Sequence, residues 1–117
     1  MIAMIFEFWF DQSAPEIYEE YLRESERVRA ALAEVEGCHG VERFSSCATP
    51  GKFVAIGFFD NEEAVTRWRN RPEHRRAQGL GRARLFTDYR LRMAELVRDY
   101  GPHDRAEVPM DSRRVHG

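Results

Sequence analysis

The sequence predicts an α+β fold, in which a four-stranded antiparallel sheet is covered by helices. Segments rich in β-branched and aromatic residues alternate with segments of helical periodicity. Their order is strand–helix–strand, repeated once along a chain of 117 residues, which is the length of one domain. Two such halves form a ferredoxin-like βαββαβ sandwich.

The first strand is expected over residues 2–10. Its apolar side chains occupy both faces, with Ile2, Met4, Phe6 and Phe8 on one and Ala3, Ile5 and Trp9 on the other. A strand that is apolar on both faces is covered on both. Helices account for one face, and a second copy of the sheet is the simplest cover for the other. The sequence therefore predicts a twofold homodimer with its sheets face to face, a dimeric α+β barrel.

The first helix follows this strand. Ser13-Ala14-Pro15-Glu16 has the pattern of a capping box, and an apolar stripe continues to about Val35, before Gly37. The second and third strands are expected over residues 39–48 and 53–59, joined by a tight turn at Thr49-Pro50-Gly51.

The second half repeats this order. Asp60 or Asn61 is positioned to cap a short helix over residues 62–70. Pro72 ends that helix and begins another turn or two. Residues 86–98 alternate as a long final strand, with Tyr89, Leu91 and Met93 on one face.

Residues 1–100 therefore form the predicted domain, and residues 101–117, which lack a periodic pattern, form a C-terminal tail. No run of 18 apolar residues and no signal-peptide pattern is present, so we expect no membrane association and a cytoplasmic protein. Cys38 and Cys47 are expected to be free thiols in that compartment.

The charge distribution argues against a nucleic-acid partner. Residues 16–36 carry seven Glu and three Arg, whereas residues 67–92 carry nine Arg and two acids. The net charge of the chain is −2. Nucleic-acid binding needs a coherent basic face, which this pattern does not predict.

Several charged and aromatic residues have two interpretations each. Glu7 interrupts an apolar strand, so it is either paired with an arginine or acts in a pocket as a base or hydrogen-bond partner. Trp68 is either a core residue or a ring that stacks on a flat ligand. His74 is either a surface or capping residue or an acid–base group. Arg90 and Arg92 are either salt-bridged or solvated at an edge, or one of them holds an anionic substrate oxygen.

Common cofactor and metal motifs are missing from the sequence. Gly79-Leu80-Gly81 lacks the third glycine of a dinucleotide fingerprint and does not follow a strand. No P-loop is present, and Cys38-His39 with Cys47 does not have zinc-ligand spacing. We therefore expect no flavin, nicotinamide, nucleotide or metal.

Four segments carry a resemblance to a known family. They are Ile5-Phe6-Glu7-Phe8-Trp9, Val41-Glu42-Arg43-Phe44, Asn61–Asn70 leading to Pro72-Glu73-His74, and Asp88-Tyr89-Arg90-Leu91-Arg92. With the strand pattern, they make residues 2–100 resemble the antibiotic biosynthesis monooxygenase superfamily of dimeric α+β barrels.

The resemblance implies a function. In members that oxygenate polyketide anthrones, a Trp on the second helix and a residue shortly after it line the pocket, and Trp68 and His74 match these positions. We expect a monooxygenase without flavin or metal, acting on a small aromatic or polyketide-type molecule that loses a proton to Glu7 or His74. The catalytic residues would be Glu7, Trp68 and His74, and the substrate-binding residues Trp9, Phe44, Tyr89 and Arg90.

Two alternatives stay open. The haem-degrading branch combines a strand-one Asn, a helix Trp and a haem-ligating His. Glu7 stands at the Asn position, and Gln78 stands about where the His is expected, because His74 comes about one helical turn too early. The other alternative is a non-catalytic dimer that binds a hydrophobic ligand.

Overall fold

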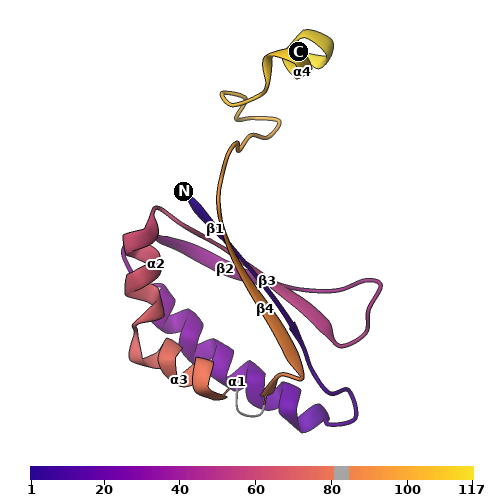
Figure 1. The fold of residues 1–117 in the computed structure, drawn as a ribbon, viewed down its shortest axis with the longest axis vertical. Coiled ribbons are helices and arrows are strands. Elements are labelled where there is room, and N and C mark those ends of the chain that lie inside the picture. Colours follow the sequence, from indigo (N-terminus) through magenta and orange to yellow (C-terminus); the bar gives the residue numbers. More distant parts are fainter. Residues whose placement is uncertain (81–84) are drawn as a thin grey trace.

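A computed structural model describes residues 1–80 and 85–117 of the chain. The elements, in order, are β1 (Ile2–Trp9), α1 (Pro15–Leu32), β2 (Cys38–Ser45), β3 (Lys52–Phe59), α2 (Glu62–Arg69), α3 (Pro72–Leu80), β4 (Asp88–Glu95) and α4 (Met110–His116). The second helix of the βαββαβ order is divided into α2 and α3, and α1, α2 and α3 lie on one side of the sheet (Figure 1). The predicted α+β, ferredoxin-like fold is confirmed.

The four strands form one antiparallel sheet in the order β2-β3-β1-β4. Ile5 of β1 lies opposite Ile56 of β3 and Arg92 of β4, and residues opposite each other share a face of the sheet. β2 approaches β3 closely where Gly57 has no side chain. A Cβ at Gly57 would lie 2.7 Å from Cγ2 of Val41.

The core lies between the sheet and the helices. Phe8 and Phe59 are the largest fully buried side chains, and both belong to the sheet face that the helices cover. The Phe8 ring centroid is 5.2 Å from that of Tyr21 in α1, and the Phe59 centroid is 5.2 Å from that of Trp68 in α2. Such pairs add about 0.5–1.5 kcal/mol to the burial of their area. They fix α1 and α2 against the sheet.

The other side of the sheet, which we call the open face, carries many apolar side chains. By register it comprises Ala3, Ile5, Glu7, Trp9, Glu42, Phe44, Lys52, Val54, Ile56, Phe58, Asp88, Arg90, Arg92 and Ala94. Phe44 is 44% exposed and Phe58 37% exposed. This is the face on which the sequence predicts a second copy of the sheet, and the dimer stays a prediction.

The start and end of α1 differ from the prediction. The capping box is wrong: the N-cap is Ala14, which makes no side-chain cap, and the hydroxyl of Ser13 donates to Asp11 Oδ1 at 2.6 Å instead. The helix also ends before the predicted Val35. Tight turns lead from there to Gly37, whose φ of +84° favours glycine.

β4 is shorter than the predicted strand, and the chain then continues away from the sheet to α4 (Figure 1). The sequence analysis missed α4 because seven residues are too few to show a helical period. Val108 is buried just before this helix, whereas Val97, Met110 and Val115 are exposed. Within the described residues, no helix combines the length and apolar composition that crossing a membrane requires.

Candidate active site

A cavity of about 410 Å³ lies between the sheet and the helices. This volume lies within the range of small-molecule sites. The cavity is lined from β1 by Met4 and Phe6; from α1 by Tyr21, Glu24, Ser25, Val28, Arg29 and Leu32; from β2 and β3 by Val41, Arg43 and Ala55; from α2 and α3 by Trp68, His74, Arg75, Ala77 and Gln78; and beyond α3 by Leu85, Phe86, Tyr89 and Leu91. Its wall is predominantly apolar, with a few polar groups.

Two aromatic side chains meet where α2 gives way to α3. The Asn61 side chain accepts a hydrogen bond from the Ala64 N–H at 2.9 Å, which starts α2 and directs Trp68 into the core. Pro72 then starts α3, which presents His74. The Trp68 and His74 ring centroids are 3.9 Å apart. The helix break therefore brings the two rings together at the cavity.

Both rings carry an unused polar atom. Trp68 Nε1 and His74 Nδ1 are buried and have no hydrogen-bond partner among the described residues. A buried polar group without a partner costs about 1–3 kcal/mol. Because both rings line the cavity, Trp68 Nε1 and His74 Nδ1 are candidate hydrogen-bonding atoms for a ligand.

The imidazole of His74 is neutral near pH 7. Burial lowers the pKa of His74 to about 4, and the positive charges of Arg75 and Arg69 act in the same direction. A neutral imidazole can accept a proton. A negative charge that develops on a bound ligand would favour the imidazolium and draw the proton to His74.

Another part of the cavity wall is formed by α1 and β2. Arg43 Nη1 donates to Ser25 Oγ at 3.3 Å, and the Arg43 guanidinium carbon is 5.3 Å from the Tyr21 ring centroid. Burial raises the pKa of Tyr21, although the adjacent Arg43 opposes this shift. Tyr21 is therefore a neutral phenol beside a cation.

Glu24 is the one acidic residue of α1 that lines the cavity among the described residues. Its carboxylate is largely buried, with 12% of the side chain exposed. Arg27 and Arg76 lie 3.4 Å and 3.3 Å from Glu24 Oε1. This charge is therefore balanced by its own two partners.

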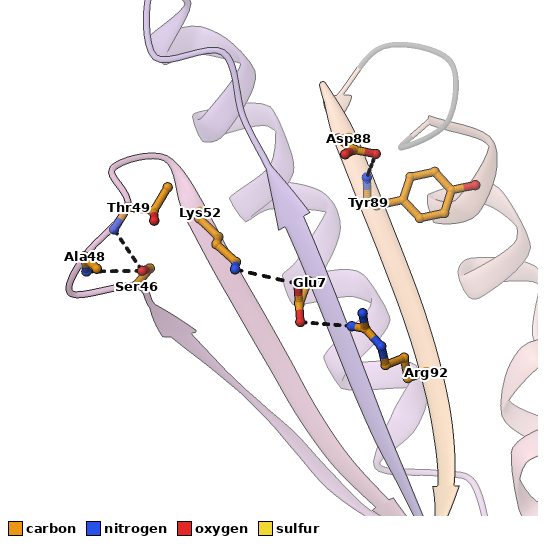
Figure 2. A network of polar contacts seen from close by, with 8 residues as sticks. All are labelled: Glu7, Ser46, Ala48, Thr49, Lys52, Asp88, Tyr89 and Arg92. Carbon is orange, nitrogen blue, oxygen red and sulfur yellow. Dashed lines mark hydrogen bonds and ion pairs between the residues drawn. The ribbon is translucent and has the colours of Figure 1, made fainter.

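Glu7 lies on the open face, across the sheet from the cavity. Arg92 Nη1 donates to Glu7 Oε1 at 2.9 Å, and Lys52 Nζ is 3.7 Å from Glu7 Oε2 (Figure 2). Lys52 Nζ is also 5.1 Å from the Trp9 ring centroid. The structure thus shows the pairing with an arginine that was one of the two interpretations of Glu7.

The predicted site residues divide between the two faces. Trp68, His74 and Tyr89 line the cavity. By register, the open face carries Glu7, Trp9, Phe44 and Arg90. The structure therefore brings Trp68 and His74 together but places Glu7 apart from them.

Sequence analysis did not single out the polar residues Tyr21, Ser25 and Arg43. A signal was present for Arg43, which is two residues from Val41 and so shares its face of β2. A charge on the inward face of a strand is unusual. Ser25 lies one helical turn after Tyr21 and extends the apolar stripe of α1.

Metal ligands are not grouped in the described part of the chain. Within residues 1–80 and 85–117, no cluster of three or more His, Cys, Asp or Glu side chains can hold a metal ion. Cys38 and Cys47 are free, and burial raises the pKa of the Cys38 thiol.

The chain is similar in sequence to known proteins. The chain is 31% identical over 97 residues to jasmonate monooxygenase ABM of Pyricularia oryzae, a match that covers 83% of this chain and 44% of that protein. The chain thus spans less than half the length of this relative. A second relative, the uncharacterized protein YqjZ of Bacillus subtilis, is 30% identical over 78 residues, 67% of each chain.

Solved structures share the fold at low sequence identity. SnoaB, a cofactor-independent oxygenase from Streptomyces nogalater solved as a mutant, has a TM-score of 0.68 at 14% identity, over 84% of this chain and 94% of its own. Rv0793 from Mycobacterium tuberculosis has a TM-score of 0.71 at 16% identity, over 86% and 98%. A family model described as antibiotic biosynthesis monooxygenase matches residues 1–80, which contain Trp68 and His74. The chain therefore belongs to the antibiotic biosynthesis monooxygenase family.

Proposed function

We propose that this protein is a monooxygenase that needs no flavin or metal and acts on a small, apolar, readily deprotonated molecule of the aromatic or polyketide type. The observation that carries the proposal is the pair of unpartnered atoms, Trp68 Nε1 and His74 Nδ1, on contacting rings in an apolar cavity. The fold shared with SnoaB and the relative named for jasmonate both support it.

In the proposed reaction, the substrate supplies the electrons. A methylene conjugated with a carbonyl group, directly or through an aryl ring, loses a proton to His74, and the Trp68 N–H donates to the carbonyl oxygen as it becomes an enolate. The enolate transfers one electron to dioxygen, and recombination of the two radicals forms a C–O bond. His74 then returns this proton to the peroxide, which gives the hydroperoxide. Loss of water from the resulting hydroperoxide leaves a second carbonyl group. One oxygen atom enters the product and the other leaves as water.

The protein contributes binding, orientation and a dry environment. Trp68 and Tyr89 bind the ring system, and the apolar wall keeps water from the radical pair. His74 is the proposed proton acceptor because it lines the cavity, whereas Glu7 lies across the sheet.

We propose that the open face serves the homodimer. Its exposed aromatic and aliphatic side chains are suited to pack against a second sheet, with Trp9 and Phe44 within that contact. Glu7 and Arg90 would add charge to it. The position of Glu7 across the sheet supports His74 in its place as the proton acceptor, and the substrate-binding role expected for Arg90 stays a prediction.

The test uses anthrone as the probe substrate, because its methylene lies beside two aryl rings and opposite a carbonyl in the same ring. Anthrone and one O₂ give anthraquinone and one water. Under ¹⁸O₂, mass spectrometry should find one labelled atom in the product, and anaerobic incubation should give no turnover. His74→Gln should lower kcat by roughly a hundredfold or more.

His103→Gln is the matched control, since His103 is an exposed histidine of the C-terminal segment. Turnover of anthrone without oxygen, or equal kcat values for the His74 and His103 variants, would overturn the proposal. A Soret band on titration with hemin would instead favour the haem alternative. Binding of anthrone without conversion would favour the non-catalytic one.

A further inference from the structure

The cavity contains a cation without a counter-ion. Arg43 is half-buried and lines the cavity from β2. Among the described residues, no carboxylate lies within 4 Å of its guanidinium, and its side-chain hydrogen bonds are to the neutral hydroxyl groups of Ser25 and Tyr21. Removing a cation from water is costly unless it is paired.

The neighbouring groups do not supply the missing charge. Tyr21, whose ring lies beside the guanidinium, stays protonated because burial raises its pKa. Glu24 is committed to Arg27 and Arg76. Among the described residues, the charged side chains that line the cavity are Arg29, Arg43 and Arg75 against Glu24, so this part of the lining is positive overall.

The geometry of an arginine determines which anion it fits. A guanidinium presents five N–H donors in a planar fork, of which Arg43 gives one to Ser25. The remaining donors suit a carboxylate, which accepts two parallel hydrogen bonds. The Ser25 hydroxyl accepts from Arg43 and donates to the Leu22 carbonyl at 3.1 Å, so it orients the guanidinium.

This site is formed by other elements than those that carry the pair of atoms assigned to the reacting group. Trp68 and His74 belong to α2 and α3, whereas Arg43 and Ser25 belong to β2 and α1. All four line one cavity whose remaining wall is mainly apolar. A ligand that satisfies both sites has a polar reacting end, an apolar body and an acidic group.

We propose that Arg43, with Ser25, is an anion subsite that anchors a carboxylate of the substrate, so that the substrate class is an apolar organic acid. That the bound acid is a substrate rests on the proposed function. That an acid binds at this position follows from the cavity alone.

The test compares each acid with its own methyl ester, which keeps the apolar body but replaces the negative carboxylate with a neutral group one methyl larger. Jasmonic acid with methyl jasmonate, and 1-naphthoic acid with methyl 1-naphthoate, are titrated into the full-length protein by isothermal titration calorimetry. At least one acid should bind more tightly than its ester. Arg43→Gln should reduce the affinity for that acid roughly tenfold to a hundredfold and leave the ester within about twofold.

Arg98→Gln is the matched control because it removes one positive charge from an exposed position after β4. It should leave the preference for the acid unchanged. Ser25→Ala should show a smaller loss than the Arg43 variant, and circular dichroism checks that each variant is folded. The subsite is overturned if neither acid is preferred, or if the Arg98 variant loses the preference as fully as the Arg43 variant.

The two proposals fail separately. If acids bind through Arg43 but neither anthrone nor a bound acid causes oxygen consumption, the anion subsite stands and the monooxygenase assignment fails. If oxygen is consumed but no acid binds in preference to its ester, the assignment stands and the subsite fails.

Discussion

The burial of His74 has a measurable effect on stability as the pH falls. Its folded-state pKa of about 4 is below the ordinary value of 6.5, so folding favours the neutral form. The contribution to stability is complete above pH 6.5 and is lost progressively as the pH falls to about 4, where the loss levels off. Each pH unit in this interval corresponds to about 1.4 kcal/mol. At about pH 4.5 we therefore expect a loss of at most about 2.5 kcal/mol from this histidine alone.

The assay is urea unfolding of the wild type and the His74→Gln variant, followed by circular dichroism from about pH 7 to about pH 4.5. The difference between the two free energies of unfolding isolates His74, because all other titrating groups are common to both proteins. That difference should change by about 2.5 kcal/mol or less, with the wild type losing more. The NMR shift of the His74 ring protons gives the pKa directly. Parallel pH profiles, or a His74 pKa near the ordinary value of 6.5, would refute the burial argument.

Four further substitutions test other parts of the structure by chemical denaturation, and the last is also tested by kinetics. Asn61→Ala should cost about 1 kcal/mol by removing the α2 cap, and full retention of stability would show that the cap is not needed. Gly57→Ala should cost about 1–3 kcal/mol because the new Cβ would lie 2.7 Å from Val41, whereas Gly79→Ala, which meets nothing within 4 Å, should be neutral or stabilising. Equal effects would contradict the packing argument. Glu7→Gln should cost about 1 kcal/mol or less and leave kcat within about threefold, because Glu7 is partly exposed and lies across the sheet from the cavity; a hundredfold fall in kcat would place it in the reaction.

The order of the elements was predictable because each leaves a local signature. The apolar and aromatic run of β1, the Asn61 cap and the break at Pro72 each depend on residues that are neighbours in the sequence. The prediction of a capping box was wrong because of another local interaction. The Ser13 hydroxyl has two acceptable partners, and Asp11, two residues away, binds it in place of the helix N–H groups.

The site was predictable only in part. The spacing of Trp68 and His74 is a local property, and the break between α2 and α3 places both at the cavity. Alternation predicted that Glu7 faces away from Phe6 and Phe8, but not which face holds the cavity. Arg43 was missed because its significance depends on the missing partner, and a missing partner becomes visible only in three dimensions.

The alternation of β1 has a consequence for how this protein can change over evolution. Neighbouring side chains of the strand point to opposite faces of the sheet. Phe6 lines the cavity, and Glu7 lies on the open face that is proposed to form the dimer. Point substitutions can therefore alter substrate choice without touching assembly. A single inserted or deleted codon within the strand would exchange the two sets of side chains and damage both properties at once.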